Sequence, residues 1–210
     1  MRSRLLAVVW LLLLAVAPAW AGAPTDQLRQ SIDRVIEILK DPALKSRVTE
    51  RRTALRRAIE PTFDFAETAR LALGRYWRDR TEQERKQFIT VFGDLLELTY
   101  FSRIEGYSGE KVAYLGDSAE GDYATVRTRI ITKKDQEIPI DYRVRRVDGR
   151  WMVYDIIIEN IGLVQNYRSQ FNTIIQTSSY QELVKKVEAK REELRNKREE
   201  ETPRTTKRES

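Results

Sequence analysis

The sequence contains no cysteine and no histidine among its 210 residues. Without cysteine the chain forms no disulfide, so its stability has to come from packing, and it offers no thiol for lipid attachment. Without histidine it can form neither a Ser-His-Asp nor a Cys-His catalytic system, and it lacks the commonest general base and the usual zinc ligand. Catalysis would have to use carboxylate, lysine or tyrosine groups. We therefore expect a protein that is not an enzyme and that binds no metal and no cofactor.

Basic residues gathered into one patch are missing as well. The 38 Lys and Arg residues are interleaved with 32 Asp and Glu residues, which gives a net charge of +6. Nucleic-acid binding needs a concentrated basic surface, so we expect no nucleic-acid partner. The mild positive surplus still favours anionic partners such as phosphate head groups.

The N-terminal residues 1–21 have the pattern of a secretory signal peptide. Arg2 and Arg4 form its basic end, the apolar run Leu5–Ala17 is short for a membrane span, and Ala19–Ala21 fits a cleavage site. An uncleaved membrane anchor is the alternative. We expect cleavage, export and a periplasmic location.

After the signal peptide the pattern predicts helices, then strands, then helices again. Residues 111–159 have the pattern of four strands, and Asp148-Gly149 is a strong signal for a tight hairpin between the last two. We therefore expect one α+β domain over residues 22–195. Residues 196–210 are almost all charged or polar, and we expect them to form a disordered tail.

The strand predicted over residues 150–159 is mostly apolar on both faces. Strict alternation places Trp151, Val153 and Ile157 on one face. The same alternation places on the other face Met152, Tyr154, Ile156 and Ile158. Both faces then need cover, which can come from helices or from a bound apolar ligand.

A short segment, Arg75-Tyr76-Trp77-Arg78, follows the glycine that ends a predicted helix. Guanidinium groups and amphipathic aromatic rings in a loop suit the rim of a pocket for an anionic head group. An ordinary surface loop with cation–π packing would have the same composition. Arg143 and Arg168 are further rim candidates.

Four carboxylates are candidate acid–base groups: Asp64, Asp141, Asp155 and Glu159. Asp155 is the best candidate for a raised pKa, because it lies on a mostly apolar strand face. However, Asp64 has the spacing of a helix cap, and Asp155 could simply pair with an arginine. The catalytic signal is therefore weak.

Two long segments resemble the MlaC family, also described as toluene-tolerance or ABC-transporter auxiliary proteins. They are residues 63–100, FDFAETARLALGRYWRDRTEQERKQFITVFGDLLELTY, and residues 149–187, GRWMVYDIIIENIGLVQNYRSQFNTIIQTSSYQELVKKV. The resemblance extends over about residues 28–187, in the order typical of the family and behind a signal peptide. It does not explain the charged tail.

The resemblance implies a periplasmic phospholipid carrier with a role in outer-membrane lipid asymmetry. Its fold would be a curved, mainly antiparallel sheet, similar to the cone of nuclear transport factor, wrapped by N- and C-terminal helices. It would exchange lipid with an inner-membrane ABC transporter carrying an MCE-domain protein and with an outer-membrane lipoprotein–porin complex. We expect a monomer.

Three alternatives stay open. A similar branch of the family implies a hopanoid-associated lipid carrier. An enzyme on a similar cone would use Asp155 or Asp64 as its base. An exported interaction protein would have a filled core and no ligand.

The resemblance also implies that apolar side chains wall the lipid cavity. The wall candidates are Phe65, Leu71, Leu73, Tyr76, Trp77, Phe92, Leu96, Tyr100, Trp151, Val153, Ile157, Tyr167 and Phe171. The candidates for the head-group rim are Arg75, Arg78 and Arg143. On the strand, we expect the face of Trp151, Val153 and Ile157 to meet the acyl chains.

Overall fold

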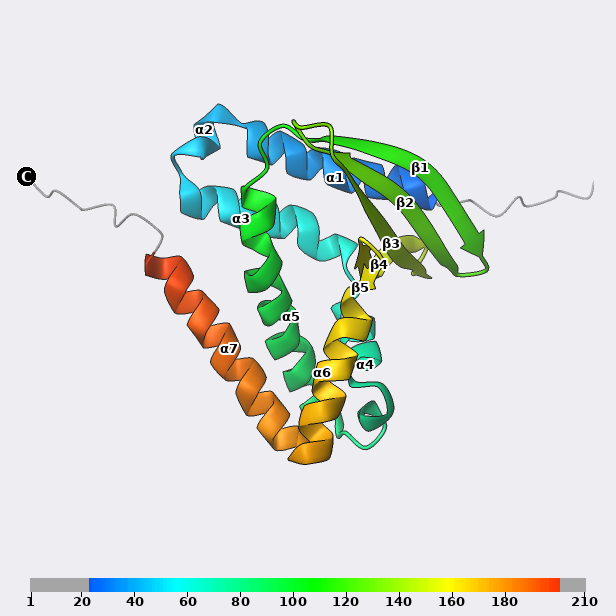
Figure 1. Cartoon of the computed structure of the whole chain (residues 1–210), viewed down its shortest axis with the longest axis vertical. Coiled ribbons are helices and arrows are strands. Elements are labelled where there is room, and N and C mark those ends of the chain that lie inside the picture. The colour runs from blue at the N-terminus through cyan, green and yellow to red at the C-terminus, as the bar shows by residue number, and fades with distance from the viewer. Residues whose placement is uncertain (1–22, 201–210) are drawn as a thin grey trace, which may run out of the picture.

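Five strands pair in chain order into one curved antiparallel sheet in the computed structural model, which describes residues 23–200 (Figure 1). They are β1 (Lys111–Glu120), β2 (Tyr123–Ile131), β3 (Glu137–Val147), β4 (Arg150–Ile158) and β5 (Ile161–Gly162). The predicted α+β class and antiparallel sheet are confirmed. The predicted signal peptide and residues 201–210 of the predicted tail lie outside the described residues.

Seven α-helices flank the sheet within the described part of the chain. Those before it are α1 (Pro24–Lys40), α2 (Pro42–Lys45), α3 (Val48–Ile59), α4 (Phe65–Leu73) and α5 (Glu82–Glu105), with 3₁₀ turns η1 (Glu60–Thr62) and η2 (Gly74–Trp77). Those after it are α6 (Leu163–Thr177) and α7 (Tyr180–Glu200). None of the helices in residues 23–200 combines the length and apolarity needed to cross a bilayer.

Side-chain caps fix where several helices begin. The Asp64 carboxylate accepts the Glu67 backbone N–H at 2.9 Å and so starts α4. Thr81 and Glu84 form a reciprocal capping box at the start of α5. The hairpin between β3 and β4 turns at Asp148 and Gly149, whose φ angles of 49° and 79° suit the predicted tight turn.

Two bulges interrupt the sheet. The register shifts between Tyr114 and Gly116 in β1, where Gly116 adopts a φ of 95° that a side chain would disfavour. It shifts again in β4, where Arg143 pairs with Asp155 but Val144 pairs with Val153, so Tyr154 is the extra residue. Bulges increase local bending and twist, which is consistent with the curvature of the sheet in Figure 1.

The bulge at Tyr154 overturns the expected alternation along β4. Val144 pairs with Val153, and Tyr142, on the same face of β3, pairs with Ile156. Trp151, Val153, Ile156 and Ile158 therefore share one face. Ile157 pairs with Asp141 on the opposite face, so the prediction that Ile157 lies with Trp151 and Val153 is wrong. The physical reason is the one extra residue, which reverses the alternation after it.

We call the face that carries Val126, Val144 and Val153 the inner face and the opposite one the outer face. Helix α1 packs on the inner face, where Leu28 is buried with Val126 and Trp151 in a small group that we call the sheet cluster. The sheet cluster comprises the buried Leu28, Ala124, Val126, Val144, Trp151 and Val153, with Ile32, Phe63, Tyr142 and Ile156 packed against them. The N-terminal end of α1 is held there by a hydrogen bond from the Thr25 hydroxyl to Asp117.

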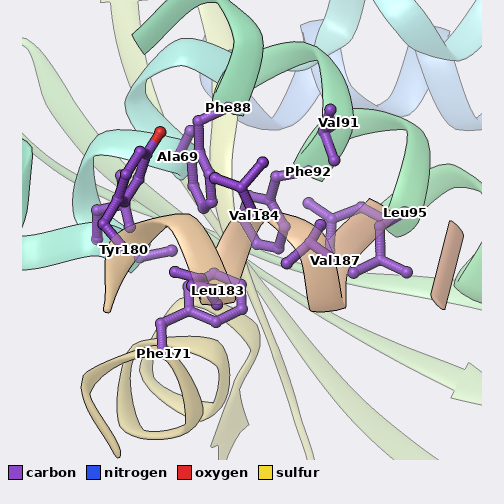
Figure 2. Packing of buried hydrophobic residues seen from close by; sticks show 13 residues of the cluster. Ala69, Phe88, Val91, Phe92, Leu95, Phe171, Tyr180, Leu183, Val184 and Val187 are labelled. Atoms are coloured by element: carbon purple, nitrogen blue, oxygen red, sulfur yellow. The ribbon is translucent and has the colours of Figure 1, made fainter. Parts of the chain in front are cut away.

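A second and larger group of buried side chains lies among α4, α5, α6 and α7, and we call it the helical cluster (Figure 2). Phe88 and Phe92 from α5 meet Phe171 from α6 and Leu183 from α7 (Figure 2). The two clusters divide the interior into a part built on the sheet and a part built only from helices.

Helix α7 extends beyond Asn196, where we expected the tail to begin, as far as Glu200. Opposite charges spaced three apart support this end, as in the pair between Lys190 and Glu193 at 2.7 Å. The guanidinium of Arg198 lies 4.7 Å from the ring of Phe101 on α5. Charged residues thus form a packed helix here because they pair with one another and with α5.

Candidate functional site

The inner face of the sheet is mostly apolar across four strands, with Asp117 and Thr128 as polar residues on it. Its directly paired side chains include Val112, Ile130 and Ile138 in one row, and Val126, Tyr142 and Ile156 in another. Most of these side chains are only half-buried, although they are apolar. The half-buried side chains of the inner face are Val112, Tyr114, Ile130, Ile138, Tyr142, Ile156 and Ile158. A face of this kind is available for an apolar ligand, because its side chains still have surface to remove from water.

Tyr114 gives this face a polar point. Its hydroxyl is buried and has no hydrogen-bond partner among the described residues, while the Arg29 guanidinium of α1 lies 4.2 Å from its ring centre. Burial raises the pKa of Tyr114 to about 12, with Asp33 adding to the effect, so the phenol stays protonated at neutral pH. An unpaired buried hydroxyl costs about 1–3 kcal/mol, which a hydrogen-bonding ligand or water would recover.

The free edge of β4 is closed by two segments from the N-terminal half. The Gln27 side-chain amide donates to the Trp151 carbonyl at 2.6 Å and accepts the Trp151 N–H at 3.0 Å. Phe63 then forms a parallel bridge with Val153, and the Asp64 N–H donates to the Val153 carbonyl at 2.8 Å. The edge therefore satisfies its backbone groups through α1 and the start of α4.

The helical cluster, in contrast, fills its interior with its own rings. The ring of Phe92 lies 5.6 Å from Phe88, 5.2 Å from Phe171 and 5.0 Å from Tyr167, in stacked and edge-to-face arrangements. Seven predicted wall residues belong to this cluster. Leu73, Phe92, Leu96 and Phe171 are buried in it, and Trp77, Tyr100 and Tyr167 are packed against it.

The remaining six wall candidates lie outside this cluster and in several different places. Trp151 and Val153 are buried on the inner face, and Ile157 is on the outer face. The Phe65 ring stacks on Phe63 at 5.7 Å and lies on Gly93 of α5, so it stands where the two clusters meet. Leu71 is half-buried, and Tyr76 lines a separate pocket. The structure thus gathers seven of the thirteen wall candidates in the helical cluster and two on the inner face, and it separates the other four.

That separate pocket lies between η2 and α6 and has a volume of about 380 Å³. It is lined by Leu73, Gly74, Arg75, Tyr76, Gln165, Arg168, Ser169 and Asn172. Of the predicted rim residues only Arg75 lines it. Arg78 is exposed outside it, and Arg143 lies on the outer face of the sheet beside Asp155. Arg168, the weaker candidate, is the second arginine of the pocket.

Asp64 and Asp155 have matching structural roles. Each caps a helix and each pairs with an arginine of β3. Asp64 caps α4 and pairs with Arg145 at 2.5 Å. Asp155 accepts the Val164 N–H of α6 at 3.0 Å and pairs with Arg143 at 3.4 Å. Because α6 has no capping side chain of its own, the carboxylate of Asp155 supplies the cap from the neighbouring strand.

The bulge explains how Asp155 reaches that position. Regular alternation would have placed its charge on the inner apolar face, whereas the extra residue Tyr154 turns it outward to the start of α6. Burial raises the pKa of Asp155, while the Val164 N–H and the Arg143 charge act in the opposite direction. The predicted raised pKa is thus confirmed in direction, in a group that holds sheet and helix together.

The other acidic candidates are not gathered around either carboxylate. Glu159 is exposed in the turn after β4, and Asp141 is half-buried opposite Ile157. Within residues 23–200, no three acidic side chains gather in a way that could hold a metal ion.

Most residues of the inner face were not among the predicted wall residues. The alternation of apolar residues along β2 and β3 was visible, and it indicated one apolar face for each strand. What joins those faces is the strand register, which pairs Ile130 with Ile138 and Val126 with Tyr142. The amphipathic α1, with Leu28 and Ile32, was the other available signal for the cover on this face.

Comparison with known proteins gives a consistent result. The sequence model of the MlaC protein family matches residues 29–189. A relative from Haemophilus influenzae, the intermembrane phospholipid transport system binding protein MlaC, is 21% identical over 173 residues, covering 79% of this chain and 81% of its own. A phospholipid-binding protein from Ralstonia solanacearum, solved in complex with a phospholipid, is 26% identical with a TM-score of 0.74, covering 83% of this chain and 99% of its own.

Proposed function

This chain belongs to the MlaC family, and we propose that it binds phospholipid through its acyl chains on the inner face of the sheet and carries it through the periplasm. The observation that carries the proposal is the inner face itself. It is mostly apolar across four strands, half-buried and packed against α1. The relative from Ralstonia solanacearum, which matches this chain over 99% of its own length, was solved with a phospholipid bound.

The energetics of lipid transfer support the use of such a face. An acyl chain in water costs about 0.8 kcal/mol per methylene, so a carrier has to cover its cargo with apolar side chains. Trp151 and Val153 already form the floor of the face, and Ile156 and Tyr142 extend it. Movement of α1 away from the sheet would expose more of this floor.

The helical cluster would serve as the rigid base of the carrier. Its rings contact one another, so acyl chains could reach Phe92 or Phe171 only if the cluster opened. Phe63 and Phe65 lie at the junction with the sheet cluster and would meet the end of a long chain first. We therefore place the acyl chains mainly on the inner face, with the junction as the end wall.

Transport requires partners in addition to this chain. The sequence contains no Walker A motif, so energy for directed transfer has to come from elsewhere. We propose docking to an inner-membrane ABC transporter with an MCE-domain protein and to an outer-membrane lipoprotein–porin complex, the partners that the resemblance to the family implies. The relative from Haemophilus influenzae is named as the binding protein of an intermembrane phospholipid transport system, which supports a role with such partners. A partner that binds the opened form more tightly would promote release.

Lipid extraction from the protein purified from the cell envelope, followed by mass spectrometry, tests the proposal. We expect phospholipid at near-stoichiometric amounts. A bound triterpenoid would favour the hopanoid carrier. A protein without lipid, even after incubation with phospholipid vesicles, would contradict lipid carriage and favour an interaction protein with a filled core.

A further inference from the structure

The pocket between η2 and α6 has a marked chemical bias. Two of its eight lining residues are arginines, and none of the described residues that line it is acidic. On α6 the polar lining residues are spaced i, i+3, i+4 and i+7, so they form one stripe along the helix: Gln165, Arg168, Ser169 and Asn172. None of the lining comes from the sheet or from α1, so the pocket is distinct from the inner face.

Neutral groups hold both arginines in place. Nη2 of Arg75 donates to the Tyr76 hydroxyl at 2.8 Å and to Oδ1 of Asn172 at 3.2 Å. Nε of Arg168 donates to the Leu71 carbonyl at 2.7 Å. Neither guanidinium forms an ion pair with a carboxylate of residues 23–200 in the way that Arg70 and Arg80 do. The pocket lining therefore carries two guanidinium charges and no carboxylate; outside the lining, the Arg168 charge acts on Asp155 of β4 and opposes the rise in the pKa of that carboxyl.

Gly74 lies against the side chain of Arg168. Its φ of 56° is strained for any side chain, and a Cβ at this position would lie 3.5 Å from Nε of Arg168. That separation is ordinary van der Waals contact, so the backbone conformation, and not the guanidinium, requires glycine at the start of η2. Arg168 of α6 and Arg75 of η2 line the same pocket.

We propose that this pocket binds a phosphate oxyanion between Arg75 and Arg168. Guanidinium groups bind phosphate oxygens through two parallel hydrogen bonds, and donors from two elements suit a tetrahedral anion. The volume of about 380 Å³ exceeds that of inorganic phosphate and lies in the range of small-molecule sites. The phosphate could come from the head group of a phospholipid or from free phosphate.

Calorimetric titration of residues 22–210, the chain without its predicted signal peptide, distinguishes these sources. One titrant is inorganic phosphate and the other is glycerophosphorylethanolamine, a lipid head group without acyl chains. Binding of the diester supports a lipid source, and binding of inorganic phosphate alone supports free phosphate. Failure of both to bind at millimolar concentrations would overturn the proposal.

Three variants assign the binding to the pocket. Arg75→Gln and Arg168→Gln should each weaken binding about tenfold or more, because each removes charge-assisted hydrogen bonds. Ser169→Asp should do the same by adding a negative charge without changing either arginine. Arg78→Gln is the matched control, because this neighbouring arginine lies outside the pocket, and it should leave binding unchanged.

Arg75 is exposed and Ser169 is exposed, so these two variants keep the test informative if Arg168→Gln disturbs the bond to Leu71. If Arg75→Gln and Ser169→Asp both fold and still bind phosphate as tightly as the wild type, the proposal is overturned. Phosphate binding in this pocket does not depend on acyl-chain binding at the inner face. A protein that binds phosphate but purifies without lipid would contradict the proposed function alone, and the reverse result would contradict the pocket alone.

Discussion

The helical cluster and the inner face differ in how completely apolar side chains are buried. In the helical cluster, thirteen buried residues from four helices contact one another, and the rings of Phe88, Phe92 and Phe171 lie within 6 Å of their neighbours. On the inner face, five buried residues of the sheet pack with Leu28 of α1 to form a floor, and apolar side chains around it stay half-buried. The first arrangement is typical of a core that stabilises the fold. The second leaves surface for a ligand.

Two carboxylates join the helices to the sheet. Asp64 links α4 to Arg145 of β3, and Asp155 links α6 to Arg143 of the same strand. In the proposed carrier the helical cluster stabilises the fold and the inner face holds the lipid, so substitutions in the two regions should have different consequences.

Phe92→Ala should have the largest effect on stability. The side chain is 1% exposed, and its removal leaves a cavity among rings that cannot collapse fully. We expect a loss of about 3–5 kcal/mol in the free energy of unfolding, measured by chemical denaturation. Lipid per folded molecule should stay near the wild-type value. A folded variant that loses its lipid would show that acyl chains enter the helical cluster.

Asp64→Ala should have an intermediate effect. It removes the cap of α4 and leaves Arg145 without its partner, so we expect a loss of about 2 kcal/mol in denaturation experiments. Asp122→Ala is the matched control. Its ion pair with Arg146 is exposed, and its loss should cost less than about 0.5 kcal/mol. Equal losses of unfolding free energy in the two variants would show that the contacts of Asp64 with α4 and Arg145 matter no more than an exposed ion pair.

Asp155→Asn should have the smallest effect at neutral pH, within about 1 kcal/mol, because the amide oxygen can still accept the Val164 N–H. The pKa of Asp155 is raised by burial above its ordinary value of 3.8, so the folded protein holds this proton more tightly than the unfolded chain. This carboxyl therefore adds stability as the pH falls through the window just above 3.8, and the contribution is lost as the pH rises.

The difference in unfolding free energy between wild type and Asp155→Asn, measured across this window, isolates that carboxyl from others. Glu67, whose pKa is lowered by Arg70, contributes with the opposite sign to both proteins and cancels. A difference that does not change with pH would contradict the raised pKa. An Asp155→Asn protein that still carries lipid and also restores an envelope defect would exclude Asp155 as an essential catalytic base.

The helix boundaries could be predicted from sequence because they depend on local chemistry. The Thr81–Glu84 capping box, the Asp64 cap and the Asp148-Gly149 turn all involve residues within three positions of one another. The bulge at Tyr154 could not be predicted in this way. Ile156, Ile157 and Ile158 are all apolar, so a shift of one residue leaves the hydrophobic pattern unchanged.

The site was harder to predict for the same reason. Its residues come together through strand register and through contacts between distant segments, such as Gln27 with Trp151 and Arg145 with Asp64. Asp155 was the one visible clue. Regular alternation would have placed its charge on an otherwise apolar face, and the bulge turns it to the opposite face.

The central claim is that acyl chains lie on the inner face, and the adjacent residues Ile156 and Ile157 test it most directly. Both are half-buried isoleucines of β4, but they point to opposite faces. Phospholipid bound per folded molecule should be measured by mass spectrometry for Ile156→Glu and Ile157→Glu, which carry the same change in size and charge. We predict that Ile156→Glu loses most of its lipid and that Ile157→Glu keeps it. Equal retention, or loss only in Ile157→Glu, would contradict the account.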